Sequence, residues 1–115
     1  MIEVLEKLGF EQPTPIQEQA IPMLLGNNPT DFIGLAQTGT GKTAAFGLPL
    51  VELIDTDNRN IQALIMAPTR ELGQQTAKQL VSFASNDRKL NVECVYGGAN
   101  ISAQIKAMKG PVQIL

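Results

Sequence analysis

The sequence has one cysteine, Cys94, among its 115 residues. A single cysteine cannot form an internal disulfide, so a secreted domain built on disulfides is excluded. The apolar residues around Cys94 predict a buried thiol in a strand. A reducing compartment fits this composition best, and we expect a cytoplasmic protein.

Long hydrophobic runs are also missing. The apolar runs at residues 32–36 and 61–67 are far too short to cross a bilayer. Residues 1–6 form an amphipathic and acidic stretch, unlike the start of a secretory signal. We therefore expect neither a membrane span nor a secretory signal.

The chain also lacks an excess of positive charge. It has 9 Lys and Arg residues against 11 Asp and Glu residues, which gives a net charge of -2. Broad, salt-driven binding to nucleic acid needs clustered cations. Any nucleic-acid site in this chain must therefore be local.

What is present is the composition of one small folded domain. The hydrophobic fraction of 43% and the charged fraction of 17% are ordinary for a globular chain and unlike those of a disordered one. A length of 115 residues is enough for one core and excludes a two-domain enzyme.

The hydrophobic pattern predicts alternating helices and strands. Helices are expected at residues 2–8, 16–25, 42–54, 70–84 and 101–108, and strands at residues 32–36, 61–67, 91–96 and 112–115. Pro49 should kink or shorten the third helix. The alternation predicts an α/β fold with a parallel sheet, helices on both faces, and ligands at the carboxyl ends of the strands. Because residues 112–115 end in an apolar segment without a turn or cap, we expect a truncated domain that can self-associate through an exposed sheet edge.

The segment from Ala36 to Thr43, Ala-Gln-Thr-Gly-Thr-Gly-Lys-Thr, predicts a phosphate-binding loop between a strand and a helix. Gly39 and Gly41 allow backbone N–H groups to turn toward an anion, and the helix that follows adds its positive end. Lys42 would reach the outer phosphates and the Thr43 hydroxyl would reach Mg2+. The alternative is a Gly-Thr-rich loop that only caps a structural helix. The general pattern asks for glycine where this chain has Ala36.

A second candidate site lies at residues 9–17. Thr14 is a natural N-cap, Pro15 takes the first helical position, and Gln17 falls where a capping box needs Glu or Gln. A side-chain amide can also pair with an adenine edge, and the ring of Phe10 could stack on its face.

Three segments together resemble the DEAD-box family of ATP-dependent RNA helicases: residues 9–17, residues 36–43, and Pro-Thr-Arg-Glu-Leu at residues 68–72. They occur in the family's order and spacing, and the family also has alanine at the position of Ala36. Gly97 and Gly98 match a further family element. The resemblance covers nearly the whole chain and implies a RecA-like fold of the P-loop NTPase type.

The resemblance implies a role for each matching residue. ATP or ADP, with Mg2+ on Thr43, would be bound by Phe10, Gln12, Gln17, Gln37, Thr38, Gly39, Thr40, Gly41, Lys42, Thr43 and Ala44, of which Lys42 and Thr43 would take part in catalysis. The RNA sugar-phosphate backbone would contact Pro68, Thr69, Arg70, Gly97 and Gly98, so RNA binding would be independent of sequence. Read without the family, residues 68–70 are a strand-to-helix turn and the two glycines are a turn.

The resemblance assigns residues 1–115 to the N-terminal part of the first helicase domain. The Asp-Glu-Ala-Asp segment, the Ser-Ala-Thr segment and the second helicase domain of the family do not occur in these residues. We therefore expect the ATP-binding portion of a helicase that unwinds or remodels RNA duplexes, without catalytic competence of its own. The alternatives are a non-catalytic nucleotide-binding or interaction module, and a chain that binds little.

Overall fold

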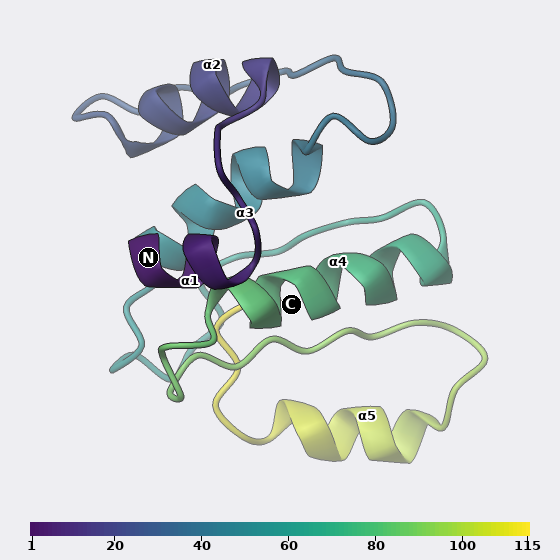
Figure 1. Cartoon of the computed structure of the whole chain (residues 1–115). Helices are drawn as coiled ribbons and strands as arrows, with labels where there is room; N and C mark the ends of the chain where they lie inside the picture. Colours follow the sequence, from purple (N-terminus) through teal and green to yellow (C-terminus); the bar gives the residue numbers. More distant parts are fainter.

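A computed structural model describes all 115 residues and contains five helices (Figure 1). The helices are α1 (Ile2–Lys7), α2 (Pro15–Leu25), α3 (Lys42–Leu53), α4 (Arg70–Phe83) and α5 (Ile101–Met108). Each one lies where the hydrophobic pattern predicts it. None of them is long and apolar enough to cross a membrane.

Side-chain caps explain where several helices begin. Thr69 Oγ1 accepts a hydrogen bond from the backbone N–H of Leu72 at 3.2 Å, which starts α4. Asn100 Oδ1 accepts one from the N–H of Ala103 at 3.2 Å, which starts α5. These bonds satisfy N–H groups that have no partner inside the helix.

Helix α3 continues past Pro49 to Leu53. Proline lacks an N–H, so the hydrogen bond from position 49 to the Ala45 carbonyl is missing. Pro49 is nevertheless buried, and its apolar ring contributes to the core face of α3. Of the two effects predicted for Pro49, shortening of the helix is wrong, and a kink stays a prediction.

Three extended segments lie side by side in parallel. Ile114 pairs with Ala63 on one side and with Val92 on the other. The Leu115 N–H donates to the Ala63 carbonyl at 3.0 Å, and the Glu93 N–H donates to the Ile114 carbonyl at 3.0 Å. The predicted parallel order is therefore present, although only as isolated bridges rather than full strands.

Two sequence predictions about the strands are wrong. Residues 32–36 make no backbone hydrogen bond to another segment, and Ile33 and Leu35 are 89% and 92% exposed. A strand needs a partner for its backbone groups, and no segment of this chain pairs its backbone with residues 32–36. Residues 112–115 are not a sheet edge, because they lie between the other two segments. Cys94 is half-buried and outside any named strand, so the prediction of a fully buried strand thiol is also wrong.

The core lies where α3 and α4 meet residues 112–115, the middle one of the three parallel segments. Its buried cluster consists of Ala44, Leu48, Leu80, Phe83 and Ile114. Gly47 allows the close approach of the two helices, since a Cβ there would lie 3.0 Å from Leu80 Cδ2. Figure 1 shows α5 on the opposite side of α4 from α1, α2 and α3, and α5 contacts none of the other helices.

Candidate nucleotide and RNA site

The predicted phosphate loop forms a turn at residues 38–40 directly before α3. Gly39 and Gly41 have φ angles of 78° and 80°, the left-handed region that favours glycine. The Thr40 hydroxyl donates to the Gln37 carbonyl at 2.6 Å and closes the turn. The loop therefore has the backbone shape that the sequence predicts, and this shape requires both glycines.

The loop leaves backbone donors unused. The first hydrogen bond of α3 runs from the Ala45 N–H to the Gly41 carbonyl, at 3.1 Å. The N–H groups of Lys42, Thr43 and Ala44 therefore have no helical partner. Ala44 is 4% exposed and its side chain belongs to the core, so only its backbone is available to a ligand.

The Lys42 side chain folds back over the loop. Its Nζ donates to the Ala36 carbonyl at 2.7 Å, on the exposed side of the loop. Ala36 is thus a hydrogen-bond acceptor through its backbone, a role that does not depend on its methyl group. A phosphate oxygen at the loop would replace this carbonyl as the partner of Lys42.

Two side chains at the start of α2 hold the loop from outside. The Thr14 hydroxyl donates to the Thr40 carbonyl at 2.7 Å, and Gln17 Nε2 donates to the Gly41 carbonyl at 3.2 Å. The same two residues form the predicted capping box, in which the Thr14 N–H donates to Gln17 Oε1 at 3.0 Å. Gln17 is 2% exposed and is thus a buried link between α2 and the loop.

These two bonds, together with the helical bond from the Ala45 N–H to the Gly41 carbonyl, set the direction of the loop's N–H groups. In a trans peptide, the carbonyl and the following N–H point in opposite directions, and the chain has no cis peptide. With the Thr40 and Gly41 carbonyls held toward α2, the N–H groups of Gly41 and Lys42 point away from it. The anchors therefore favour the orientation that an anion in the loop needs.

The other predicted adenine residues line a cavity beside α2. Phe10, Gln12 and Gln17 share a cavity of about 500 Å3, with Leu48 of α3 on its wall. The Phe10 ring also packs edge-on against Phe83, with ring centroids 6.2 Å apart. The structure thus brings the three residues together and shows that Phe10 has a packing role as well.

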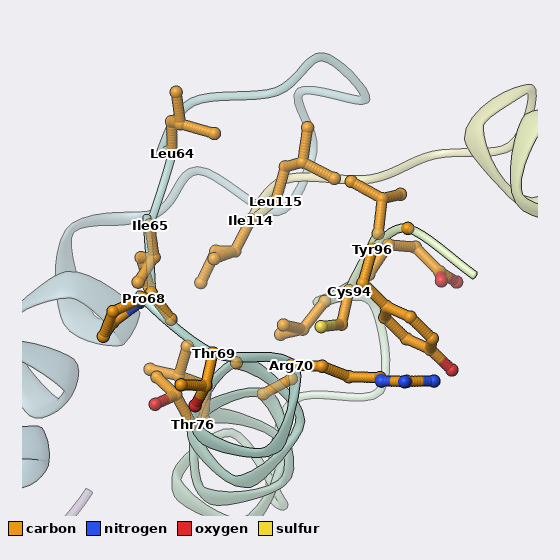
Figure 2. Close-up of a pocket in the computed structure, with 18 residues that line it drawn as sticks. Leu64, Ile65, Pro68, Thr69, Arg70, Thr76, Cys94, Tyr96, Ile114 and Leu115 are labelled. Carbon is orange, nitrogen blue, oxygen red and sulfur yellow. The ribbon is translucent and has the colours of Figure 1, made fainter. Parts of the chain in front are cut away.

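Most of the predicted RNA-binding residues line a second cavity, of about 430 Å3 (Figure 2). Pro68, Thr69 and Arg70 enter it from the start of α4, and Gly97 lies on its wall. Gly98, with a φ of 83°, lines an adjoining hollow. The two separate sequence segments therefore meet at one place.

A family model described as DEAD/DEAH box helicase matches residues 14–115, nearly the whole chain. The chain belongs to the DEAD/DEAH box helicase family. Its relatives include the ATP-dependent RNA helicase CshA of Limosilactobacillus reuteri, 53% identical over all of this chain and 22% of that protein. The ATP-dependent RNA helicase DeaD of Escherichia coli is 44% identical, over all of this chain and 18% of that protein. The chain thus spans about a fifth of the length of these relatives.

Solved structures of the DEAD/DEAH box family share the fold. A DEAD box protein from Methanococcus jannaschii matches with a TM-score of 0.90 and 40% identity, over 98% of this chain and 30% of that one. Dbp5 of S. cerevisiae bound to RNA and ADP BeF3 matches with a TM-score of 0.79 and 28% identity, over 98% of this chain and 28% of that one. The fold class is therefore confirmed as part of the RecA-like domain of DEAD-box helicases.

Charged groups contribute little to the shape of this DEAD/DEAH box site. The only ion pair of the chain joins Lys89 to Asp57 at 2.7 Å. Its hydrogen bond lowers the pKa of Asp57 and raises the pKa of Lys89, but both side chains are exposed. Hydrogen bonds to backbone carbonyls, rather than ion pairs, therefore fix the loop.

Sequence reasoning missed three side chains at or beside the site. Thr14 was predicted only as a helix cap. Tyr96, which lines the cavity of Figure 2, and Gln104, which lines the adjoining hollow, were assigned no role. Tyr96 directly precedes the glycine pair, which could have marked it, whereas nothing in the sequence distinguishes Gln104 from other glutamines on a helix.

Proposed function

We propose that this chain is the ATP-binding portion of an ATP-dependent RNA helicase that unwinds or remodels RNA duplexes. We assign residues 1–115 to the N-terminal part of the first helicase domain. The observation that carries the proposal is the phosphate loop with its two anchored carbonyls, at Thr40 and Gly41. A loop that only capped a helix would not need two long-range hydrogen bonds to hold its backbone.

The loop fits ATP or ADP with Mg2+. The N–H groups of residues 41–44 supply donors for the phosphate oxygens, and Gln37, Thr38 and Thr40 shape the turn around them. Lys42 exchanges the Ala36 carbonyl for the outer phosphates, and the Thr43 hydroxyl is the contact for Mg2+. Bound Mg2+ supplies charge neutralisation on the phosphate oxygens.

Gln17 is proposed to read the adenine base. Its amide has two donors and about two acceptor sites, of which one donor and one acceptor bind Gly41 and Thr14. One donor and one acceptor remain, which is what the edge of adenine can pair with. Phe10 and Gln12 line the same cavity and would contact the base from there.

RNA is the proposed polymer ligand, bound through its backbone and without sequence preference. Four of the predicted residues meet at one cavity and Gly98 lies beside it; the four are Pro68, Thr69, Arg70 and Gly97. Together they offer backbone groups, one hydroxyl and one guanidinium rather than base-reading amides. The match to Dbp5 bound to RNA supports this assignment. We also infer a cytoplasmic location, since a chain with one half-buried cysteine suits a reducing compartment.

The direct test is a titration with a fluorescent Mg-ADP analogue. We expect saturable binding by the chain and a loss of at least tenfold in affinity in Lys42→Ala, because one charge-assisted contact to the phosphates disappears. Lys78→Ala, which removes an exposed lysine of α4, is the matched control and should bind normally. Equal binding by Lys42→Ala would refute the proposed loop. ATP turnover that depends on Lys42 would show that the chain is more than a non-catalytic module.

A further inference from the structure

Arg70 is held in an unusual way for a cation on a helix. It is the first residue of α4, where the positive end of the helix dipole opposes a positive side chain. It has no carboxylate partner, because the only ion pair of the chain involves Lys89 and Asp57. Neither helix stability nor an ion pair therefore accounts for its position.

The guanidinium of Arg70 instead lies over the ring of Tyr96. Its central carbon is 5.5 Å from the ring centroid, a cation–π distance (Figure 2). A guanidinium held over a ring by this kind of contact keeps its five N–H groups available for other partners. The group is thus restrained but retains its hydrogen-bonding capacity for an anion.

Tyr96 in turn is fixed by a single side chain, Gln104 of α5. The Tyr96 N–H donates to Gln104 Oε1 at 2.9 Å, and Gln104 Nε2 donates to the Tyr96 carbonyl at 3.1 Å. The bond from the Glu93 N–H to Ile114 is the last backbone pairing on this segment before Tyr96. Gln104 therefore takes the place of a neighbouring strand at this position.

These contacts form a continuous connection from α5 to the start of α4. Helix α5 touches no other helix and buries no residue of its own, so this connection is a principal attachment of α5 near the site. It passes directly beside Gly97 and Gly98, which share a hollow with Tyr96 and Gln104. The arrangement keeps the guanidinium next to the glycines instead of free in solvent.

We propose that Tyr96 and Gln104 are positioning residues that hold Arg70 ready for a phosphate of the RNA backbone. The inference rests on the RNA part of the proposed function and adds two residues to it. Because the restrained guanidinium loses less side-chain freedom on binding, removing the ring should weaken RNA affinity about two- to fivefold.

The test measures binding of a fluorescein-labelled oligouridine by anisotropy at several salt concentrations. Arg70→Gln should weaken binding and reduce the salt slope by about 0.7, the value for one phosphate contact on a single strand. Tyr96→Leu and Gln104→Leu should weaken binding, whereas Tyr96→Phe, which keeps the ring, should bind like the wild type. In the Arg70→Gln background, Tyr96→Leu should have no further effect. Gln75→Leu, an exposed glutamine of α4, is the control for Gln104→Leu.

A second readout does not need RNA. The ring of Tyr96, whose centroid is 5.5 Å from the central carbon of the Arg70 guanidinium, should shift the NMR signals of the Arg70 side chain. This shift should vanish in Tyr96→Leu, shrink in Gln104→Leu and persist in Tyr96→Phe. Failure of the wild type to bind RNA would overturn the proposed RNA contact and this inference with it. Wild-type binding with additive effects of Arg70→Gln and Tyr96→Leu, or an unshifted Arg70, would overturn the inference alone.

Discussion

At the scale of single residues, the Thr14 side chain both caps α2 and anchors the phosphate loop. It marks the start of α2, and its hydroxyl donates to the Thr40 carbonyl, 26 residues further along the chain. Local sequence chemistry predicted the role of Thr14 as a helix cap. It could not predict the contact with the loop, because the partner is a backbone carbonyl and every residue has one.

Replacing Thr14 tests whether the anchor matters for the nucleotide. Thr14→Val keeps the shape of the side chain and removes the hydroxyl, so the Thr40 carbonyl loses a partner. We expect affinity for Mg-ADP to fall about three- to tenfold, in line with roughly 1 kcal/mol for one hydrogen bond. Isothermal titration calorimetry of the two proteins measures this.

Thr14→Ser is the matched control, since it retains the hydroxyl and should restore most of the affinity. The affinities for ADP and GDP should fall by the same factor in Thr14→Val, because the Thr14 hydroxyl acts on the phosphate loop rather than on the base. An unchanged affinity in Thr14→Val would show that the loop holds its shape without this bond.

Gln17 shows the same limit of sequence reasoning in a different form. The spacing from Thr14 predicted the capping box, and the structure confirms it. The hydrogen bond from Gln17 to the Gly41 carbonyl could not be predicted from local sequence, because the two residues are 24 positions apart. Position 41 requires glycine for two reasons. Its φ of 80° lies in the left-handed region, and a Cβ at this position would collide with the Gln17 amide. The reading of adenine by Gln17 stays a prediction.

At the scale of elements, the helices were predictable and the strands only in part, because three of the four expected segments pair in parallel and residues 32–36 do not. Helices close their hydrogen bonds locally, so caps such as Thr69 and Asn100 are enough to place their starts. Strands depend on neighbours distant in sequence. Residues 32–36 have the apolar composition of a buried strand, but Ile33 and Leu35 are almost fully exposed because no segment of the chain pairs with them.

Helix α5 offers a test at this scale. Asn100→Ala removes the cap and should destabilise α5 by about 0.5–2 kcal/mol. Because α5 buries no residue and contacts no other helix, the loss should be local. We expect faster amide hydrogen exchange at residues 101–108 with little change in the global melting temperature.

Asn100→Asp, which keeps an oxygen acceptor at the same place, is the control and should exchange like the wild type. A drop in the global melting temperature of Asn100→Ala would contradict the local picture. It would mean that α5 is coupled to the core more strongly than its contacts indicate.

At the scale of the whole molecule, exposed apolar surface suggests self-association. The sequence predicted residues 112–115 as the exposed sheet edge through which copies associate. That segment instead lies between the segments of Ala63 and Val92, and its residues 112–114 are buried. Residues 32–36 are the better candidate, since Leu35 is 92% exposed and the segment makes no backbone hydrogen bond to another segment. We predict concentration-dependent dimers in sedimentation experiments, reduced by Leu35→Glu.

Leu53→Glu is the control for this prediction, since Leu53 is also exposed, at 62%, but lies at the end of α3. It should leave the dimers in place. A strictly monomeric wild type at all concentrations would rule out this surface as a contact between copies.

We propose that the loop and the start of α2 form one adenine-nucleotide site. The most direct measurement is competition against a bound fluorescent Mg-ADP analogue by unlabelled ADP and GDP. We predict displacement by ADP at concentrations at least tenfold below those of GDP. The Gln17 amide is proposed to pair with the donor and acceptor of the adenine edge, and guanine has a carbonyl in place of the amino donor. Equal displacement would contradict the adenine assignment, and absence of any binding would contradict the nucleotide site itself.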